Sequence, residues 1–175
     1  PVCLYENDLE GARNILRGLG LEDLSGDQIT DPYVLRAVRD QALGSGDPRA
    51  RELMRAMAEK WDPTVGQAKL RVGEALWQID FILVAAQWRK SIGELRSAEA
   101  SARAALEWIE LQDRTPLGRL YDDERATALA ILGQGDAAIA VLESAYADGR
   151  RGEWNSDREP AFAAFRNETR FRALT

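Results

Sequence analysis

Three consecutive acidic residues, Asp122, Asp123 and Glu124, are the first candidates for chemistry in this chain. Clustered carboxylates can bind a metal ion or act as a general acid and base. All three fall in the first turn of a helix expected at about 121–132, where negative charge stabilises the helix dipole. We therefore interpret them as helix-stabilising residues and expect no metal site here.

Most catalytic arrangements need residues that this chain lacks. The sequence contains no histidine, which excludes His-based triads, His metal sites and imidazole pH switches. Its single cysteine, Cys3, has no partner for an internal disulfide. The segment Asp23–Asp27 lacks the alternating acids of an EF-hand loop. Gly18 and Gly20 follow an expected helix, whereas a dinucleotide fingerprint follows a strand. We expect no enzyme activity, no cofactor and no metal.

An aromatic row is the first candidate for binding a partner. Trp77, Phe81 and Trp88 stand at offsets of 0, 4 and 11, so they share one helix face. Such a row can line a groove that holds a peptide or a small apolar ligand. Packing in the core is the alternative, and the more common role for aromatic residues at helical spacing.

Arginines border the turn after this helix. Arg96 and Arg103 are seven residues apart and can clamp a carboxylate or phosphate of a partner. Solvation is the alternative, or pairing such as that of Arg103 with Glu99 four residues earlier. The full candidate partner groove comprises Trp77, Phe81, Trp88, Arg89, Arg96 and Tyr121.

The elements that must position these residues are helices. Asp-Pro pairs at 31–32, 47–48 and 62–63 are typical of helix starts, because Asp caps free amides and Pro has none to leave unpaired. No segment alternates apolar and polar residues over the length of a strand, which predicts an all-α fold. We expect helices at about 8–17, 32–43, 48–60, 63–90, 94–111, 121–132 and 136–146, and two short ones near 159–166 and 168–174.

Small residues recur at a fixed distance after a glycine. Gly93 is followed by Ala98 and Ala105, and the pattern returns 40 residues later. The second copy is Gly133, Ala138 and Ala145, and weaker copies are anchored at Ala12, after Asn7, and at Ala50, after Ser45. Repeats of this length, with two helices each, are typical of α-solenoids.

This pattern resembles the tetratricopeptide repeat (TPR) family, which favours Gly at the turn between helices and Ala at the fifth and twelfth positions beyond it. The turn Leu132–Asp136 (Leu-Gly-Gln-Gly-Asp) is also common in that family. The chain departs from the family in its longer period, in the length of the helix at 63–90, and in lacking a Trp-x2-Leu-Gly signature. The resemblance implies a TPR-like α-solenoid of about three to four antiparallel helix pairs.

The C-terminal sequence extends the resemblance. The segment Arg158–Phe162 (Arg-Glu-Pro-Ala-Phe), followed by Phe165 and Phe171, is similar to the end of TPR arrays in bacterial signalling proteins. These proteins include winged-helix transcriptional regulators, often membrane-anchored, and nucleotide cyclases. The usual Asp-Pro-Arg-Phe ending is replaced here by Glu168–Phe171 (Glu-Thr-Arg-Phe), which lacks the proline. The three phenylalanines are expected to cap the apolar end of the last repeat.

One helical-repeat domain is therefore predicted over 1–175, with degenerate repeats at 1–60, two clearer ones at 63–146, and a loop and cap at 147–175. The net charge of −6 disfavours contact with nucleic acid, and no apolar run is long enough to span a membrane.

The expected function is a non-catalytic scaffold that binds a protein or peptide, and a second copy of the chain is among the expected partners. It would form the C-terminal regulatory or sensory module of a larger bacterial signalling protein or transcriptional regulator. The alternative is a small-molecule sensor with a pocket on the long helix. The resemblance favours the periplasmic face of a membrane-anchored protein over the cytoplasm.

Overall fold

The structure, a computed structural model, describes residues 25, 29, 32–62, 75–112, 121–149 and 159–174, without the side chains of 75–77 and 112. Several predictions lie outside these residues. They are the helix at 8–17 with the repeat copy at Ala12, the features at Cys3 and Gly18–Gly20, most of Asp23–Asp27, and positions 63–74 of the long helix.

The described part of the chain contains seven α-helices and no strand, so the all-α prediction is confirmed. The elements are α3 (Pro32–Gly44), α4 (Pro48–Lys60), α5 (Ala75–Ser91), α6 (Leu95–Gln112), α7 (Asp122–Ile131), α8 (Gly135–Ala147), the 3-10 helix η2 (Pro160–Phe162) and α9 (Thr169–Arg172). The helix expected at 159–166 is wrong in type and extent. Hydrogen bonds three residues apart, such as those from Phe162 to Glu159 and from Phe165 to Phe162, wind this segment into a 3-10 helix and turns.

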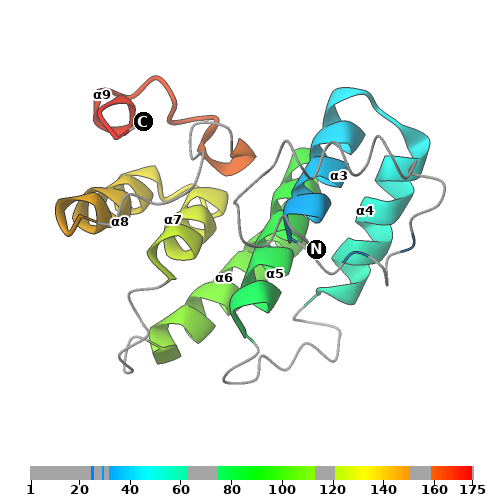
Figure 1. The fold of residues 1–175 in the computed structure, drawn as a ribbon, viewed down its shortest axis with the longest axis horizontal. Helices are drawn as coiled ribbons and strands as arrows, with labels where there is room; N and C mark the ends of the chain where they lie inside the picture. The colour runs from blue at the N-terminus through cyan, green and yellow to red at the C-terminus, as the bar shows by residue number, and fades with distance from the viewer. Residues whose placement is uncertain are drawn as a thin grey trace.

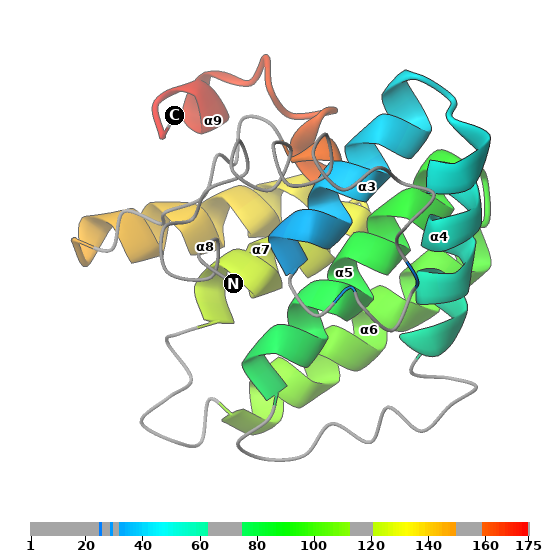
Figure 2. The same cartoon turned by 45° about the vertical axis from the view of Figure 1, so that its right-hand side comes forward.

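Helices joined by short turns pack against each other as α3 with α4, α5 with α6, and α7 with α8. Helix α5 also contacts α3, α4 and α7, which places it at the centre of the molecule (Figure 1). The first helix of the middle pair, α5, thus lies between α3 and α7, the first helices of the other two pairs (Figure 2). Within the described residues, none of the helices is both long enough and apolar enough to cross a membrane.

The turns at Gly93 and Gly133 have the same backbone hydrogen bonds. Both glycines have positive φ, 87° and 77° respectively, a conformation that costs other residues energy. In each turn the amide that follows the glycine donates to the carbonyl five residues earlier, at 2.9 Å. The α5–α6 and α7–α8 turns thus repeat at an offset of 40 residues, as the glycine pattern predicts.

The α3–α4 turn differs in register from the sequence prediction. Ser45 was expected at the turn position, but the residue with positive φ is Gly46 (71°). The positive φ falls at Gly46 because glycine adopts it at little cost, and the next residue, Asp47, caps α4. Its carboxylate accepts hydrogen bonds from the amides of Arg49 at 2.8 Å and Ala50 at 3.2 Å.

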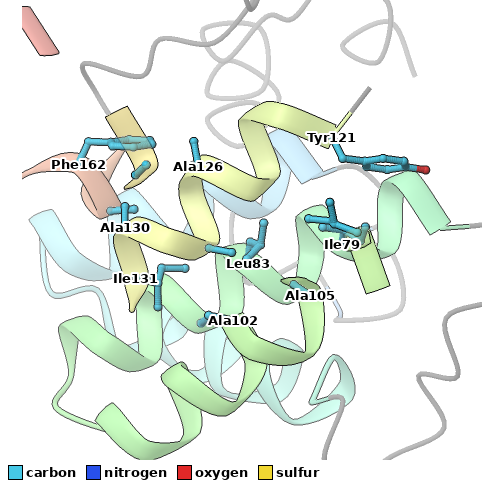
Figure 3. Close-up of a cluster of buried hydrophobic side chains, with 14 of the residues drawn as sticks. Ile79, Leu83, Ala102, Ala105, Tyr121, Ala126, Ala130, Ile131 and Phe162 are labelled. Carbon is cyan, nitrogen blue, oxygen red and sulfur yellow. The ribbon is translucent and has the colours of Figure 1, made fainter. Parts of the chain in front are cut away.

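Two hydrophobic clusters meet on α5. One cluster, shown in Figure 3, joins Ile79 and Leu83 to the alanine face of α6 and to α7. The other includes Phe81 and Trp88 and packs against α3 and α4. A helix buried on more than one side must be apolar around most of its circumference, which explains the nearly unbroken apolar run in α5. The repeat alanines, Ala98, Ala105, Ala138 and Ala145, are all buried.

The C-terminal residues 159–174, here called the strap, contact both α3 and α8. Phe162 and Phe171 stack with ring centroids 5.3 Å apart and belong to the cluster of α5, α6, α7 and α8. Phe165 lies so close to Gly135 that a Cβ there would be 2.2 Å from the ring. Arg170 forms ion pairs with Asp136 and Glu143 of α8. The strap thus packs its phenylalanines against the last helices, and its backbone runs along the upper edge in Figure 1.

Candidate functional site

The aromatic residues proposed for a groove lie inside the protein. Phe81 and Trp88 are each 3% exposed, and Tyr121 is 4% exposed. Phe81 stacks on Trp61 with ring centroids 4.8 Å apart, and Tyr121 meets Trp108 edge-on at 5.2 Å. Side chains at this depth do not reach a partner at the surface, so these three occupy core positions. For Phe81 and Trp88 this is the alternative that the sequence left open. The backbone of Trp77 lies in α5, and its side chain is outside the described residues.

The arginines divide between interior and surface. Arg89 is buried and bridges α4 to α5, through an ion pair with Asp62 at 2.8 Å and a hydrogen bond donated to the Ala58 carbonyl at 2.9 Å. Arg96 is exposed. Arg103 pairs with Glu99 at 2.8 Å, as their spacing predicts. The five predicted groove residues whose side chains are described are therefore not brought together on one accessible surface.

The acidic cluster lies in the first turn of α7, as predicted, but its members differ in burial. Asp122 and Asp123 are half-buried, whereas Glu124 is 6% exposed and its Oε2 has no hydrogen-bond partner in the described structure. Burial, with a further contribution from Asp80, raises the pKa of Glu124 well above its usual value. Among the residues described, no set of three or more potential ligands is arranged to hold a metal ion.

A network of buried polar side chains joins α3, α5 and the strap. The Glu159 carboxylate lies 3.2 Å from Arg36 Nε and 3.1 Å from Arg39 Nη1. Arg36 also forms an ion pair with Asp80 at 2.7 Å, and Arg39 donates a hydrogen bond to Gln87. This network was not predicted from the sequence. Its signals in the sequence are Asp80, inside the apolar run of α5, and Gln87, at the end of that run.

The charges of this network are matched, as buried charges must be. Burial alone would raise the pKa of Glu159, but Arg39 and Arg36 outweigh it and hold that pKa below the usual value. Glu159 is therefore ionised at neutral pH. Since the strap covers these groups, we assign the network to holding the strap on α3 and α5.

An open groove lies between α6 and α7. Its volume is about 490 Å³, and it is lined by Arg103, Leu106, Glu107, Glu110, Arg125, Leu129, Leu132 and Gln134. The three leucines form an apolar floor, because each is partly buried against the main hydrophobic cluster. Arg103, Glu107 and Glu110 are exposed along one face of α6. The groove thus combines an apolar floor with charged walls and is open to solvent.

A smaller cavity of about 270 Å³ lies under the strap. It is lined by Gln87, Lys90, Ser91, Ile131, Pro160, Ala161, Ala163 and Ala164. Lys90 Nζ donates hydrogen bonds to the carbonyls of Ala130 at 3.2 Å and Ile131 at 2.6 Å, near the C-terminal end of α7. Burial lowers the pKa of Lys90. Its ammonium group therefore lies at the negative end of the α7 helix dipole, where it binds the last carbonyls of the helix.

Comparisons of the chain with models of protein families, with curated proteins and with solved structures gave no match.

Proposed function

We propose that this chain is a non-catalytic, TPR-like helical-repeat module that binds a protein segment in the groove between α6 and α7. The repeated turns at Gly93 and Gly133 support the repeat assignment, as do the contacts among the first helices α3, α5 and α7. In an α-solenoid, each helix pair packs on its neighbour in this way. The packing of Phe162 and Phe171 on the last helices is what a terminal cap requires.

The single observation that carries the binding proposal is the open groove itself. Leu106, Leu129 and Leu132 remain only partly buried in a hollow large enough to admit side chains of a partner. Partly exposed leucines bordered by charges are typical of grooves that receive an amphipathic helix. By contrast, the layer of α3 and α5 beneath Glu159 is closed by the strap.

This function is tested by selecting peptides from a displayed library of helices against the full chain. Affinities of the selected peptides are then measured for the variants Leu106→Ser and Leu132→Ser. We expect each variant to weaken binding about tenfold or more, because each removes apolar area from the floor. Leu111→Ser is the matched control, since Leu111 lies on α6, is 58% exposed and does not line the groove. Selected peptides that bind all three variants like the unmodified chain would refute the groove assignment.

A second function is favoured by the cavity under the strap. Its lining includes Gln87, Lys90 and Ser91 of α5, so a small molecule bound there would contact both this helix and the strap. A metabolite that raises the melting temperature of the chain, but not of an Ala161→Trp variant that fills the cavity, would support this sensor role. The bacterial origin, the compartment and the place in a signalling protein stay predictions from the sequence.

A further inference from the structure

The charges on the α6 wall of the groove are separated by sign along the helix. Arg103 precedes Glu107 by one turn and Glu110 by two turns. Seven residues of α-helix correspond to about 10.5 Å, so Arg103 and Glu110 stand roughly that far apart along the groove. All three side chains are exposed. A partner that lies along α6 therefore meets a positive charge at one end and negative charges at the other.

These charges are available to a partner. Arg103 is 59% exposed, and its ion pair is with Glu99, which is also exposed and does not line the groove. An exposed pair of this kind contributes little energy, so exchanging Glu99 for a carboxylate of a partner costs little. No ion pair is found for Glu107 or Glu110 within the part of the chain that the structure describes. Arg125, on the opposite wall, has an interaction of its own within the chain.

The shape of the groove favours a helix as the occupant. Helices α6 and α7 run in opposite directions on its two sides (Figure 2). Leu106 lines the groove from α6, Leu129 from α7, and Leu132 from the residue that caps the end of α7. A third helix packed between two others buries an apolar stripe on such residues while keeping its own backbone hydrogen bonds. Its charged residues then lie beside the stripe, level with the walls.

We infer that the partner segment is an amphipathic helix with a leucine-like apolar stripe flanked by an acidic residue and, about two turns away, a basic residue. The acidic residue pairs with Arg103 and the basic residue with Glu107 and Glu110. This inference rests on the proposed function, because it describes the occupant of the same groove. It adds the chemistry that distinguishes this partner from other amphipathic helices.

The test uses three lactam-constrained helical peptides that share one leucine stripe and differ at two flanking positions seven residues apart. The bipolar peptide carries Glu and Lys there, the acidic peptide carries two Glu, and the basic peptide carries two Lys. We expect the full chain to bind the bipolar peptide about three- to tenfold more tightly than either other peptide in low salt. The preference should largely disappear in 0.5 M NaCl.

Charge reversal of the protein gives matched controls that leave the core untouched. Arg103→Glu should shift the preference to the basic peptide, and Glu107→Lys with Glu110→Lys should shift it to the acidic peptide. Equal affinity for all three peptides, with binding still lost in Leu132→Ser, would overturn the inference and leave the proposed function standing. Absence of any binding that depends on Leu106 or Leu132 would overturn both.

The remaining possibility is that a second copy of this chain occupies the groove. Sedimentation equilibrium of the full chain and of Arg103→Glu decides this point. We expect both to be monomers at micromolar concentration. A wild-type dimer that Arg103→Glu dissociates would identify a second copy as the occupant and overturn the inference of a separate helical partner.

Discussion

The layer beneath the strap and the groove between α6 and α7 both combine arginine and glutamate with apolar side chains, but they differ in exposure. Arg39 and Glu159 have side chains 2% and 8% exposed, whereas that of Arg103 is 59% exposed. A buried charge must be matched within the fold, because its desolvation is otherwise uncompensated. An exposed charge is solvated and remains available to a partner. The comparison separates groups that hold this fold together from groups that can recognise another molecule.

The largest effect should come from breaking the buried network. Glu159→Ala leaves Arg36 and Arg39 without their shared carboxylate, and we expect the free energy of unfolding to fall by about 3 to 5 kcal/mol. Glu107→Ala in the groove is the matched control and should change it by less than about 0.5 kcal/mol. Urea unfolding followed by circular dichroism measures both. Equal losses in the two variants would contradict the distinction between the two regions.

The contact between Phe165 of the strap and Gly135 of α8 provides a second test. In Gly135→Ala the new Cβ would lie 2.2 Å from Phe165 Cε1, so the ring must move. We expect a loss of about 1 to 3 kcal/mol of unfolding free energy, the usual cost of overpacking. The double variant with Phe165→Ala should lose less than the two single variants together, because removal of the ring relieves the clash. Strict additivity in thermal unfolding would show that the strap does not rest on Gly135.

Two carboxylates near Arg36 should respond to pH in opposite directions. The pKa of Glu124 is raised, so its stabilising contribution is fully present below its unfolded-state value, near 4.5, and is lost as pH rises through the folded-state value. The pKa of Glu159 is lowered, so its contribution is present above that unfolded-state value and is lost as pH falls through the folded-state value.

Substitution of Glu124 isolates its contribution from that of Glu159. Glu124→Gln should increase the unfolding free energy at pH 8 relative to wild type, by about 1.4 kcal/mol for each unit by which the pKa is raised. The gain should be smaller at pH 5, where Glu124 in the unfolded chain is partly protonated. Urea titrations at pH 5, 6.5 and 8 measure the difference. An identical effect of the substitution at all three pH values would show that the surroundings of Glu124 do not raise its pKa.

The smallest effect on stability should come from the groove wall. Arg103→Ala removes only an exposed pair with Glu99 and should change the unfolding free energy by less than about 0.5 kcal/mol. The same variant should weaken binding of the bipolar peptide severalfold. Arg103→Ala should therefore affect binding more than stability, whereas Glu159→Ala should affect stability more than binding. A loss of several kcal/mol in Arg103→Ala would place this residue among the structural charges.

The sequence allowed the helices and the turns at Gly93 and Gly133 to be predicted because those signals are local. A glycine with positive φ and buried alanines at helical spacing are recorded in a few neighbouring residues. The pairing of Arg36 and Arg39 with Glu159 was not predictable in this way, since it joins residues about 120 positions apart. Asp80 and Gln87 gave the local hints, as polar residues within and at the end of an apolar run.

The candidate site could be predicted only in part for the same reason. Aromatic spacing put Phe81 and Trp88 on one helix face but gave no information on what covers that face, and α3 and α4 cover it. The groove depends on how α6 and α7 approach each other. Leu106 and Leu129 look like ordinary core leucines in the sequence, and only the packing leaves them accessible from the groove.

Hydrogen–deuterium exchange of the full chain, with and without a selected helical peptide, tests the central claim most directly. If the groove binds partners and the buried network holds the fold, the peptide should slow exchange in residues 103–110 and 125–134. Exchange in residues 36–39 and 159–162 should not change. Slower exchange confined to α3 and the strap, with α6 and α7 unaffected, would contradict the account and assign partner binding to the layer beneath the strap.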